Sequence, residues 1–261
     1  MLDTRTKIED LQLEVFAATA DMAAAAAAGT AQVLTQAVAE RGAARVVIAT
    51  GNSQLAFVTA LAGYNVPWAD VTVFHMDEYV GIDANHPASF RRWIRERIAE
   101  PFGPARVEYI DGEATDVEAE CRRYEELLRA APIDLTCMGI GENGHLAFNE
   151  PGQADFDDPR WVRRITLTPE SLHQQVGEGH FPDVDAVPPT AISLTVPALL
   201  SARVVQVVAP EQRKAAAVRN TLTLPIDASC PSTILRRTPN ATLYLDANSA
   251  GDSLDLLPTT A

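Results

Sequence analysis

The chain has 261 residues and a formal net charge of -14, and its length allows a full hydrophobic core in one large α/β domain. The acidic balance argues against a nucleic-acid partner and against attraction to an anionic membrane surface, because both reward basic faces. Three scattered cysteines are too few for a disulfide framework or a zinc cluster, and the N-terminal residues lack the apolar core of a signal peptide. We therefore expect a cytoplasmic protein.

The first half of the chain alternates helical and strand-like patterns. A long helix is expected over residues 8–41, and its alanine-rich part suits close packing against a sheet. The β-branched segment 45–49 predicts a buried strand that runs into a glycine turn at residues 50–53. A helical segment at 54–62 follows, and a second strand at 71–74 leads to the polar group at residues 75–79.

The second half continues this alternation. Helices are expected over 87–98, with Pro87 in the first turn, and over 116–131, with a short strand at 107–110 between them. The apolar run at 133–140 breaks into a glycine-rich turn. Further elements are expected as a strand at 203–209, a helix at 211–220 and a strand at 241–245.

Residues 151–189 are rich in Asp, Pro and Gln and predict irregular structure with one short helix, and residues 152–185 are expected to form a mobile lid. Strands that alternate with helices indicate a single α/β domain over residues 1–261, with a mainly parallel sheet and helices on both faces. Ligands bind such sheets beyond the carboxyl ends of the strands. The polar turns fall at those ends, so we expect them to converge.

The first turn is a candidate phosphate site. Thr50, Gly51, Asn52 and Ser53 follow a strand and precede a helix, so their backbone N–H groups can cradle a phosphate at the positive end of the helix dipole. The turn is neither a Walker P-loop nor a dinucleotide-binding turn, and many glycine turns only reverse the chain. Lys214 could supply a cation near the same anion, although a solvent-facing lysine is the alternative interpretation.

Two further groups are candidates for acid/base chemistry. Asp77 and Glu78 are adjacent at a strand end, where successive side chains point to opposite sides, so at most one is expected to face a site. One could be a base, and the alternative is a solvated acidic turn or a helix cap. His145 lies in a glycine-flanked turn with Glu142 and Glu150 nearby, and a carboxylate bonded to one imidazole nitrogen prepares the other for proton transfer. A structural histidine is the alternative.

No metal is expected, because the remaining histidines are spread without the spacing of metal ligands and cysteine pairs are absent.

Several motifs occur in one order along most of the chain. They are Ala-Thr-Gly-Asn-Ser at 49–53, Phe-His-Met-Asp-Glu-Tyr-Val-Gly at 74–81, His-Pro-Ala-Ser-Phe at 86–90, Met-Gly-Ile-Gly-Glu-Asn-Gly-His-Leu-Ala-Phe-Asn-Glu-Pro at 138–151, Ile-Ser-Leu-Thr-Val at 192–196, and Lys214. In this order they resemble the glucosamine-6-phosphate deaminase family, which is related to the 6-phosphogluconolactonases.

The resemblance implies a modified Rossmann-like α/β fold. It also implies conversion of a hexosamine 6-phosphate, a small-molecule phosphosugar, to a ketose 6-phosphate and ammonia without a metal or organic cofactor. In that family the aspartate that matches Asp77 moves a proton between C2 and C1, and the histidine that matches His145 assists ring opening, steadied by carboxylates of which one matches Glu150. The resemblance assigns the phosphate to Thr50, Gly51, Asn52, Ser53, Gly139 and Lys214.

Three departures from the family pattern bear on the substrate. Asn143 stands where the family usually has an aspartate, so it can orient the imidazole by a hydrogen bond but supplies no negative charge. Leu172 stands where the family commonly has an arginine that clamps the phosphate, and His173 or Arg164 are possible substitutes. The first turn reads Gly-Asn-Ser-Gln at 51–54 in place of the more usual Gly-Ser or Gly-Thr-Pro.

Two alternatives stay open beside a deaminase, and Asn143 and Leu172 keep the second of them open. One is a phosphosugar lactonase, which would use His145 as a base toward water, and the other is a sugar-phosphate-binding regulator without turnover. Motifs 76–79 and 147–151 favour the deaminase. Related enzymes occur both as monomers and as higher oligomers, so a homo-oligomer is also open.

Overall fold

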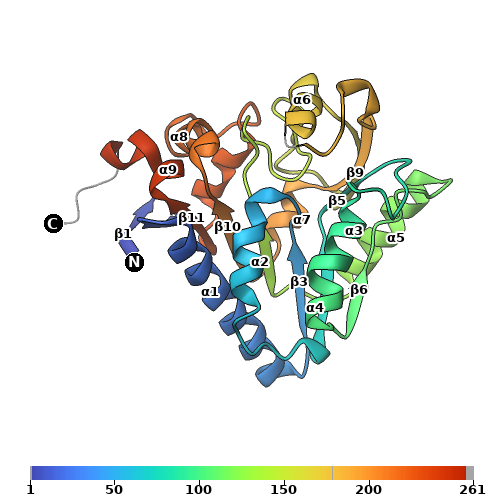
Figure 1. Cartoon of the computed structure of the whole chain (residues 1–261), viewed down its shortest axis with the longest axis horizontal. Coiled ribbons are helices and arrows are strands. Elements are labelled where there is room, and N and C mark those ends of the chain that lie inside the picture. The colour runs from blue at the N-terminus through green and yellow to red at the C-terminus, as the bar shows by residue number, and fades with distance from the viewer. Residues whose placement is uncertain (1, 178, 257–261) are drawn as a thin grey trace.

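The centre of the molecule is a mainly parallel eight-stranded sheet with helices on both faces (Figure 1). The structure is a computed structural model that describes residues 2–177 and 179–256. In sheet order the strands are β1 (Leu2–Ile8), β2 (Leu11–Phe16), β11 (Ala241–Asp246), β10 (Val204–Ala209), β7 (Leu135–Met138), β3 (Ala44–Ile48), β4 (Val71–His75) and β6 (Arg106–Glu108). Only the β1–β2 pair among these neighbours is antiparallel. The predicted α/β class is confirmed.

Two hydrophobic clusters form the core, one on each face of this sheet. In β3, Val46 and Ile48 belong to one cluster and Val47 to the other, as expected where successive side chains point to opposite faces. The helices are α1 (Thr19–Arg41), α2 (Leu55–Leu61), α3 (Phe90–Ile94), α4 (Glu100–Phe102), α5 (Val117–Arg129), α6 (Pro169–Gly177), α7 (Val196–Leu200), α8 (Ala215–Thr223) and α9 (Ala247–Ala250). No helix in the described ranges is both long and apolar enough to cross a membrane.

The start of the helix expected over residues 8–41 was wrong. A β1–β2 hairpin occupies the beginning of that stretch, and α1 starts only at Thr19. Leu11, Leu13 and Val15 alternate with more polar residues and are almost completely buried, which is the two-residue period of a strand. The alanine-rich run of α1 does pack against the sheet, as predicted, because small side chains let helix and strands approach closely.

The helix expected over 87–98 also begins later than predicted. Ser89 is the N-cap of α3 and accepts a hydrogen bond from the backbone N of Arg92, so Pro87 lies before the helix. The helical path continues through a π-helical segment (Arg95–Ala99) to α4. The start of α3 is fixed by the carboxylate of Glu78, which accepts hydrogen bonds from the first backbone N atoms of the helix.

The segment 151–189 is more ordered than the irregular structure predicted for it. It contains β8 (Val162–Thr166) and α6, and β8 pairs with β9 (Thr190–Leu194). β9 pairs in turn with β5 (Asp77–Tyr79), which completes a separate antiparallel sheet in the order β5-β9-β8. This small sheet connects α6, which lies above the large sheet in Figure 1, to the strand that carries Asp77. The mobility of residues 152–185 stays a prediction.

Candidate active site

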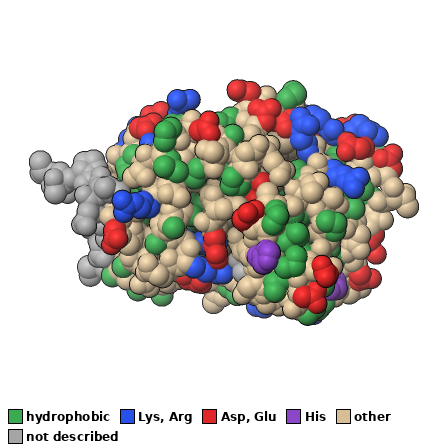
Figure 2. Space-filling view, turned by 90° about the horizontal axis from the view of Figure 1, so that it is seen from above, with side chains coloured by type: hydrophobic (Ala, Val, Ile, Leu, Met, Phe, Trp, Pro, Cys, Tyr) green, Lys and Arg blue, Asp and Glu red, His purple; other side chains and the backbone are tan. Residues whose placement is uncertain are grey.

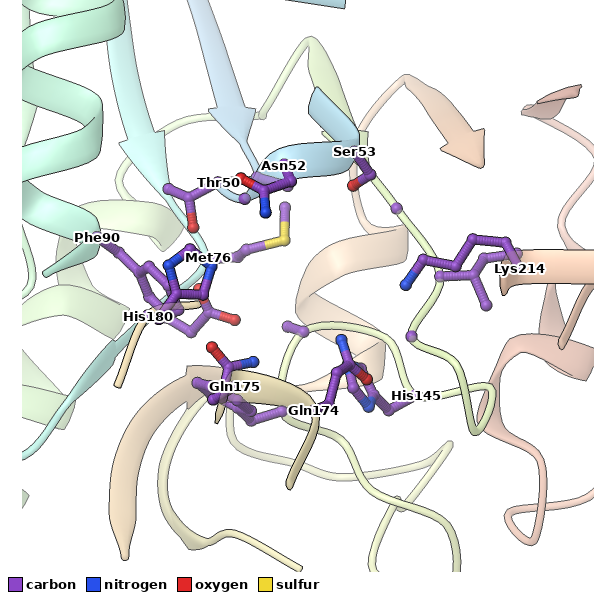
Figure 3. A pocket seen from close by; sticks show the side chains of 18 residues that line it. Thr50, Asn52, Ser53, Met76, Phe90, His145, Gln174, Gln175, His180 and Lys214 are labelled. Carbon is purple, nitrogen blue, oxygen red and sulfur yellow. The ribbon is translucent and has the colours of Figure 1, made fainter. Parts of the chain in front are cut away.

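A cavity with about 650 Å³ of empty space lies where the polar turns meet, beyond the carboxyl ends of β3, β4 and β7. Eight of the ten predicted site residues line it: Thr50, Gly51, Asn52, Ser53, Asp77, Gly139, His145 and Lys214. Asn143 and Glu150 lie behind His145 instead. The convergence predicted for the three turns is therefore confirmed, and Figure 3 shows them around a common space.

The first turn presents the start of a helix to this cavity. Gly51 has φ +101°, a backbone conformation that favours glycine, and the chain then enters a 3-10 turn (Asn52–Gln54) and α2. A Cβ on Gly139 would lie 3.1 Å from Gln54 Nε2 and 3.4 Å from Ser53 Oγ. The absence of a side chain at 139 thus lets the turn approach β7 closely, and the N–H groups of the turn suit an anion.

Lys214 is almost completely buried and reaches into the cavity beside this turn. It ends a 3-10 turn (Gln212–Lys214) that leads into α8. The preceding Glu211 has φ +77°, and its backbone N donates to both carboxylate oxygens of Asp246, at 3.2 and 3.3 Å. Figure 3 shows the Lys214 ammonium directed at the interior of the cavity. The alternative of a solvent-facing lysine is wrong.

His75 holds the backbone that presents Asp77. Its Nε2 accepts a hydrogen bond from the backbone N of Ile110 at 2.9 Å, so the proton lies on Nδ1, which donates to the carbonyl of Asp77 at 2.9 Å. Burial lowers the pKa of His75 to about 3. The neutral imidazole is therefore a structural connector between the β4–β5 junction and the end of β6, and it takes no part in acid/base chemistry.

Asp77 and Glu78 point to opposite sides of β5, as predicted. Asp77 faces the cavity with 7% of its surface exposed, and burial, with a smaller contribution from the charge of Glu78, raises its pKa to about 8. Glu78 is fully buried and accepts hydrogen bonds at the start of α3 from Ser89 Oγ at 2.7 Å and from the backbone N of Phe90 and Arg91 at 3.2 and 2.8 Å. Glu78 is thus a helix cap and Asp77 is the carboxyl that faces the site.

The imidazole of His145 faces the carboxylate of Glu150, which in turn contacts Asn143. Its Nδ1 lies 3.7 Å from Glu150 Oε2, and Glu150 is fully buried. Asn143 Nδ2 donates to the same carboxylate oxygen at 3.0 Å, and Asn143 Oδ1 accepts from the backbone N of His145 at 3.1 Å. Asn143 therefore holds the carboxylate and the backbone of the turn, whereas the imidazole ring faces Glu150. Ser171 Oγ also donates to Glu150.

Glycine is required at position 141 to seat the imidazole. A Cβ there would lie 2.3 Å from both Cε1 and Nε2 of His145, closer than real contacts allow. The backbone N of Gly141 also donates to the carbonyl of His145 at 2.9 Å, which closes the turn around the ring. The glycine-rich sequence around His145 is thus a steric requirement of the site.

The segment around α6 supplies one wall that the sequence did not predict. Gln174, Gln175 and His180 line the cavity from this side. Leu172 instead packs against a third hydrophobic cluster, and it carries no group that could bind an anion. Neither proposed substitute lines the cavity, because Arg164 is exposed on β8 and His173 Nδ1 contacts the carbonyl of Pro169.

The face of the molecule drawn in Figure 2 offers no broad basic surface to an anionic ligand. Figure 2 shows the face seen from above with acidic and basic side chains interspersed over it. Inside the cavity, Lys214 and the N–H groups of residues 50–53 are groups that can attract a phosphate.

Residues 17–244 match the family model described as glucosamine-6-phosphate isomerases/6-phosphogluconolactonase. The chain belongs to this family. A glucosamine-6-phosphate deaminase of Listeria monocytogenes serotype 4a (strain HCC23) is 34% identical over 203 residues, which cover 78% of this chain and 85% of the relative. A glucosamine-6-phosphate deaminase of Lactobacillus delbrueckii subsp. bulgaricus (strain ATCC BAA-365 / Lb-18) is 31% identical over 212 residues, covering 81% and 88%. The protein is thus an enzyme of this family.

Solved structures of the family have the same fold. A monomeric glucosamine-6-phosphate deaminase superposes with a TM-score of 0.84 at 27% identity, over 91% of this chain and 98% of the other. A 6-phosphogluconolactonase from Shewanella baltica OS155 superposes with a TM-score of 0.75 at 20% identity, over 93% and 100%. The second likeness concerns the fold alone.

Proposed function

We propose that the protein converts glucosamine 6-phosphate and water into fructose 6-phosphate and ammonia. The observation that carries this proposal is that a buried carboxyl, Asp77, and an imidazole backed by a carboxylate, His145, line one cavity together with Lys214. Curated deaminases at 31–34% identity support the same reaction. The three cysteines of the chain are free and buried, which fits a reducing cytoplasm.

The phosphate would bind between Lys214 and the turn at residues 50–53. The ammonium and the backbone N–H groups at the start of α2 both favour a negative charge. Because this contact is remote from the reacting carbons, its binding energy orients the rest of the sugar. The opposite end of the cavity, which contains Asp77, then receives C1 and C2.

His145 would act in opening the sugar ring. Opening removes a proton from the C1 hydroxyl and adds one to the ring oxygen, and a neutral imidazole can do both in succession. The positive charge that develops on the imidazole of His145 is stabilised by Glu150, whose Oε2 lies 3.7 Å from Nδ1 of His145. Asn143, at the position where the family usually has a charged aspartate, instead donates a hydrogen bond to Glu150.

Asp77 would then move the carbon-bound proton. It removes the proton from C2, beside the C1 aldehyde, and returns a proton to C1, while the C1 oxygen gains the proton that the C2 ammonium loses, which leaves a protonated imine at C2. Water adds to that imine and expels ammonia, so that the atoms balance. Burial favours the protonated form of Asp77, but the substrate's own C2 ammonium would favour the ionised form that the step requires.

The two alternatives remain distinguishable from this proposal. A lactonase needs only a base toward water and has no use for a carboxyl at C2, so the buried Asp77 on the cavity wall favours the deaminase. A binding protein without turnover would not require Gly141 to be free of a side chain to seat the imidazole.

One set of assays tests the proposal. Purified protein is given glucosamine 6-phosphate, and ammonia and fructose 6-phosphate are measured beside hydrolysis of 6-phosphogluconolactone. We expect equal amounts of ammonia and fructose 6-phosphate and no lactone hydrolysis above background. Lactone hydrolysis without ammonia release, or calorimetric binding of the phosphosugar without turnover, would overturn the proposal.

A further inference from the structure

Tyr79 connects the strand of Asp77 to the wall formed by α6. It is fully buried among aromatic rings, with centroid distances of 5.0 Å to Phe90, 5.6 Å to Phe148 and 5.5 Å to Phe181. Its hydroxyl nevertheless donates to Oε1 of Gln175 at 2.6 Å. The hydroxyl of Tyr79, in an otherwise apolar cluster, thus fixes the position of the Gln175 amide.

Gln175 presents the other half of that amide to the cavity. The side chain is 94% buried but still lines the cavity, and Figure 3 shows it reaching toward the interior. Because the carbonyl oxygen is occupied by Tyr79, the amide can offer its N–H₂ group, a neutral donor, to a ligand. In this arrangement, with the Tyr79 hydroxyl as donor, the N–H₂ group of the amide is the end turned away from Tyr79.

The position of Gln175 indicates which part of a sugar phosphate it meets. Tyr79 and Asp77 are two residues apart on β5, so their side chains leave the strand on the same side. In Figure 3, Gln175 lies with His180 and Phe90 on one side of the cavity, across from Lys214. A phosphate held by Lys214 would therefore be remote from Gln175.

We propose that Gln175, oriented by Tyr79, is a specificity-determining residue that donates a hydrogen bond to a hydroxyl oxygen of the sugar carbon skeleton and does not bind the phosphate. This inference rests on the proposed function. A neutral donor suits an uncharged hydroxyl, whereas a phosphate is better matched by a cation. Tyr79 is a positioning residue that acts through Gln175.

The first test compares a phosphosugar with phosphate alone. Gln175→Leu keeps the volume but removes the donor, and we expect kcat/KM for glucosamine 6-phosphate to fall roughly tenfold. Calorimetric Kd for glucitol 6-phosphate, an open-chain probe that needs no turnover, should rise by a similar factor. The Kd for inorganic phosphate should not change. A parallel rise in both Kd values would overturn the proposal, because Gln175 would then bind the phosphate.

The second test asks whether Tyr79 acts through Gln175. Tyr79→Phe keeps the ring in its aromatic cluster, and we expect it to raise the Kd for glucitol 6-phosphate in the wild-type background but to have no effect when Gln175→Leu is already present. An equal loss in both backgrounds would show a merely structural role and refute the pairing. Gln36→Leu, an exposed glutamine on α1, serves as the control and should leave both Kd values unchanged.

The two proposals fail separately. If the wild-type enzyme releases no ammonia, the proposed function is wrong, but the binding measurements still decide what Gln175 contacts. If ammonia is released and Gln175→Leu leaves kcat/KM and the Kd for glucitol 6-phosphate unchanged, only the assignment of Gln175 is wrong.

Discussion

Replacing Asp77 by asparagine should lower turnover strongly and, at alkaline pH, make the protein more stable. Asp77 is 93% buried and faces a cavity, and burial raises the pKa of its carboxyl from 3.8 to about 8. A carboxyl with a raised pKa in the folded protein stabilises it fully below pH 4, and that contribution is lost as the pH rises toward 8. Asparagine has the same shape and does not titrate.

The size of the effect follows from the pKa. Each pKa unit corresponds to about 1.4 kcal/mol, so the rise from 3.8 to about 8 sets an upper bound of about 6 kcal/mol. Water in the cavity relieves part of the cost of the charged form, and we expect the variant to gain about 2–4 kcal/mol over the wild type at pH 9 and little at pH 4.5.

Urea unfolding of both proteins at pH 4.5 and pH 9 measures this difference. Asp70→Asn removes an exposed carboxylate and should change the free energy of unfolding by no more than about 0.5 kcal/mol at either pH. A stability difference for Asp77→Asn that is the same at both pH values would refute the reasoning. In activity assays the variant should lose about 10³-fold in kcat, and kcat/KM of the wild type should rise with pH through about 8 as Asp77 ionises.

Three further variants test the remaining parts of the site. Lys214→Met should raise KM for the phosphosugar about 10- to 100-fold with a smaller change in kcat, measured by steady-state kinetics, because a charged hydrogen bond to the phosphate is lost. Glu150→Gln should lower kcat about tenfold by removing the charge that stabilises protonated His145, and an unchanged kcat would contradict that role. Gly141→Ala should displace the imidazole and lower kcat at least about 100-fold, whereas Gly177→Ala, which meets no atom within 4 Å, should be active.

Most strands of the large sheet, and the polar turns at its edge, could be predicted from the sequence. Short apolar runs such as those of β3 and β7, which both break into a glycine turn, are local signals, and their order along the chain placed the turns together. The hairpin β1–β2 was missed because its alternating Leu11, Leu13 and Val15 stand directly before a long alanine-rich helix. A helical interpretation of the whole stretch hid the two-residue period.

The α6 wall of the site could not be predicted in the same way. β5 pairs with β9 across more than a hundred residues of chain, and β8 pairs with the other edge of β9, so each of these short strands is stabilised by partners that no local pattern reveals. A helix cap was one alternative expected for the Asp77–Glu78 pair, and Glu78 takes that role on α3, 13 residues further along the chain. Gln175 reaches the cavity only because this small sheet brings α6 over it, and glutamine in a polar segment gives no signal of its own.

Reaction of glucosamine 6-phosphate in D₂O tests the central claim, that Asp77 moves a proton from C2 to C1, most directly. Proton NMR would follow ammonia release together with deuterium at C1 of fructose 6-phosphate. We expect the wild-type enzyme to release ammonia and to add one hydrogen at a single C1 position, either the proton removed from C2 or one exchanged with solvent. Asp77→Asn should form fructose 6-phosphate about 10³-fold more slowly. Ammonia release by Asp77→Asn at the wild-type rate would contradict the claim.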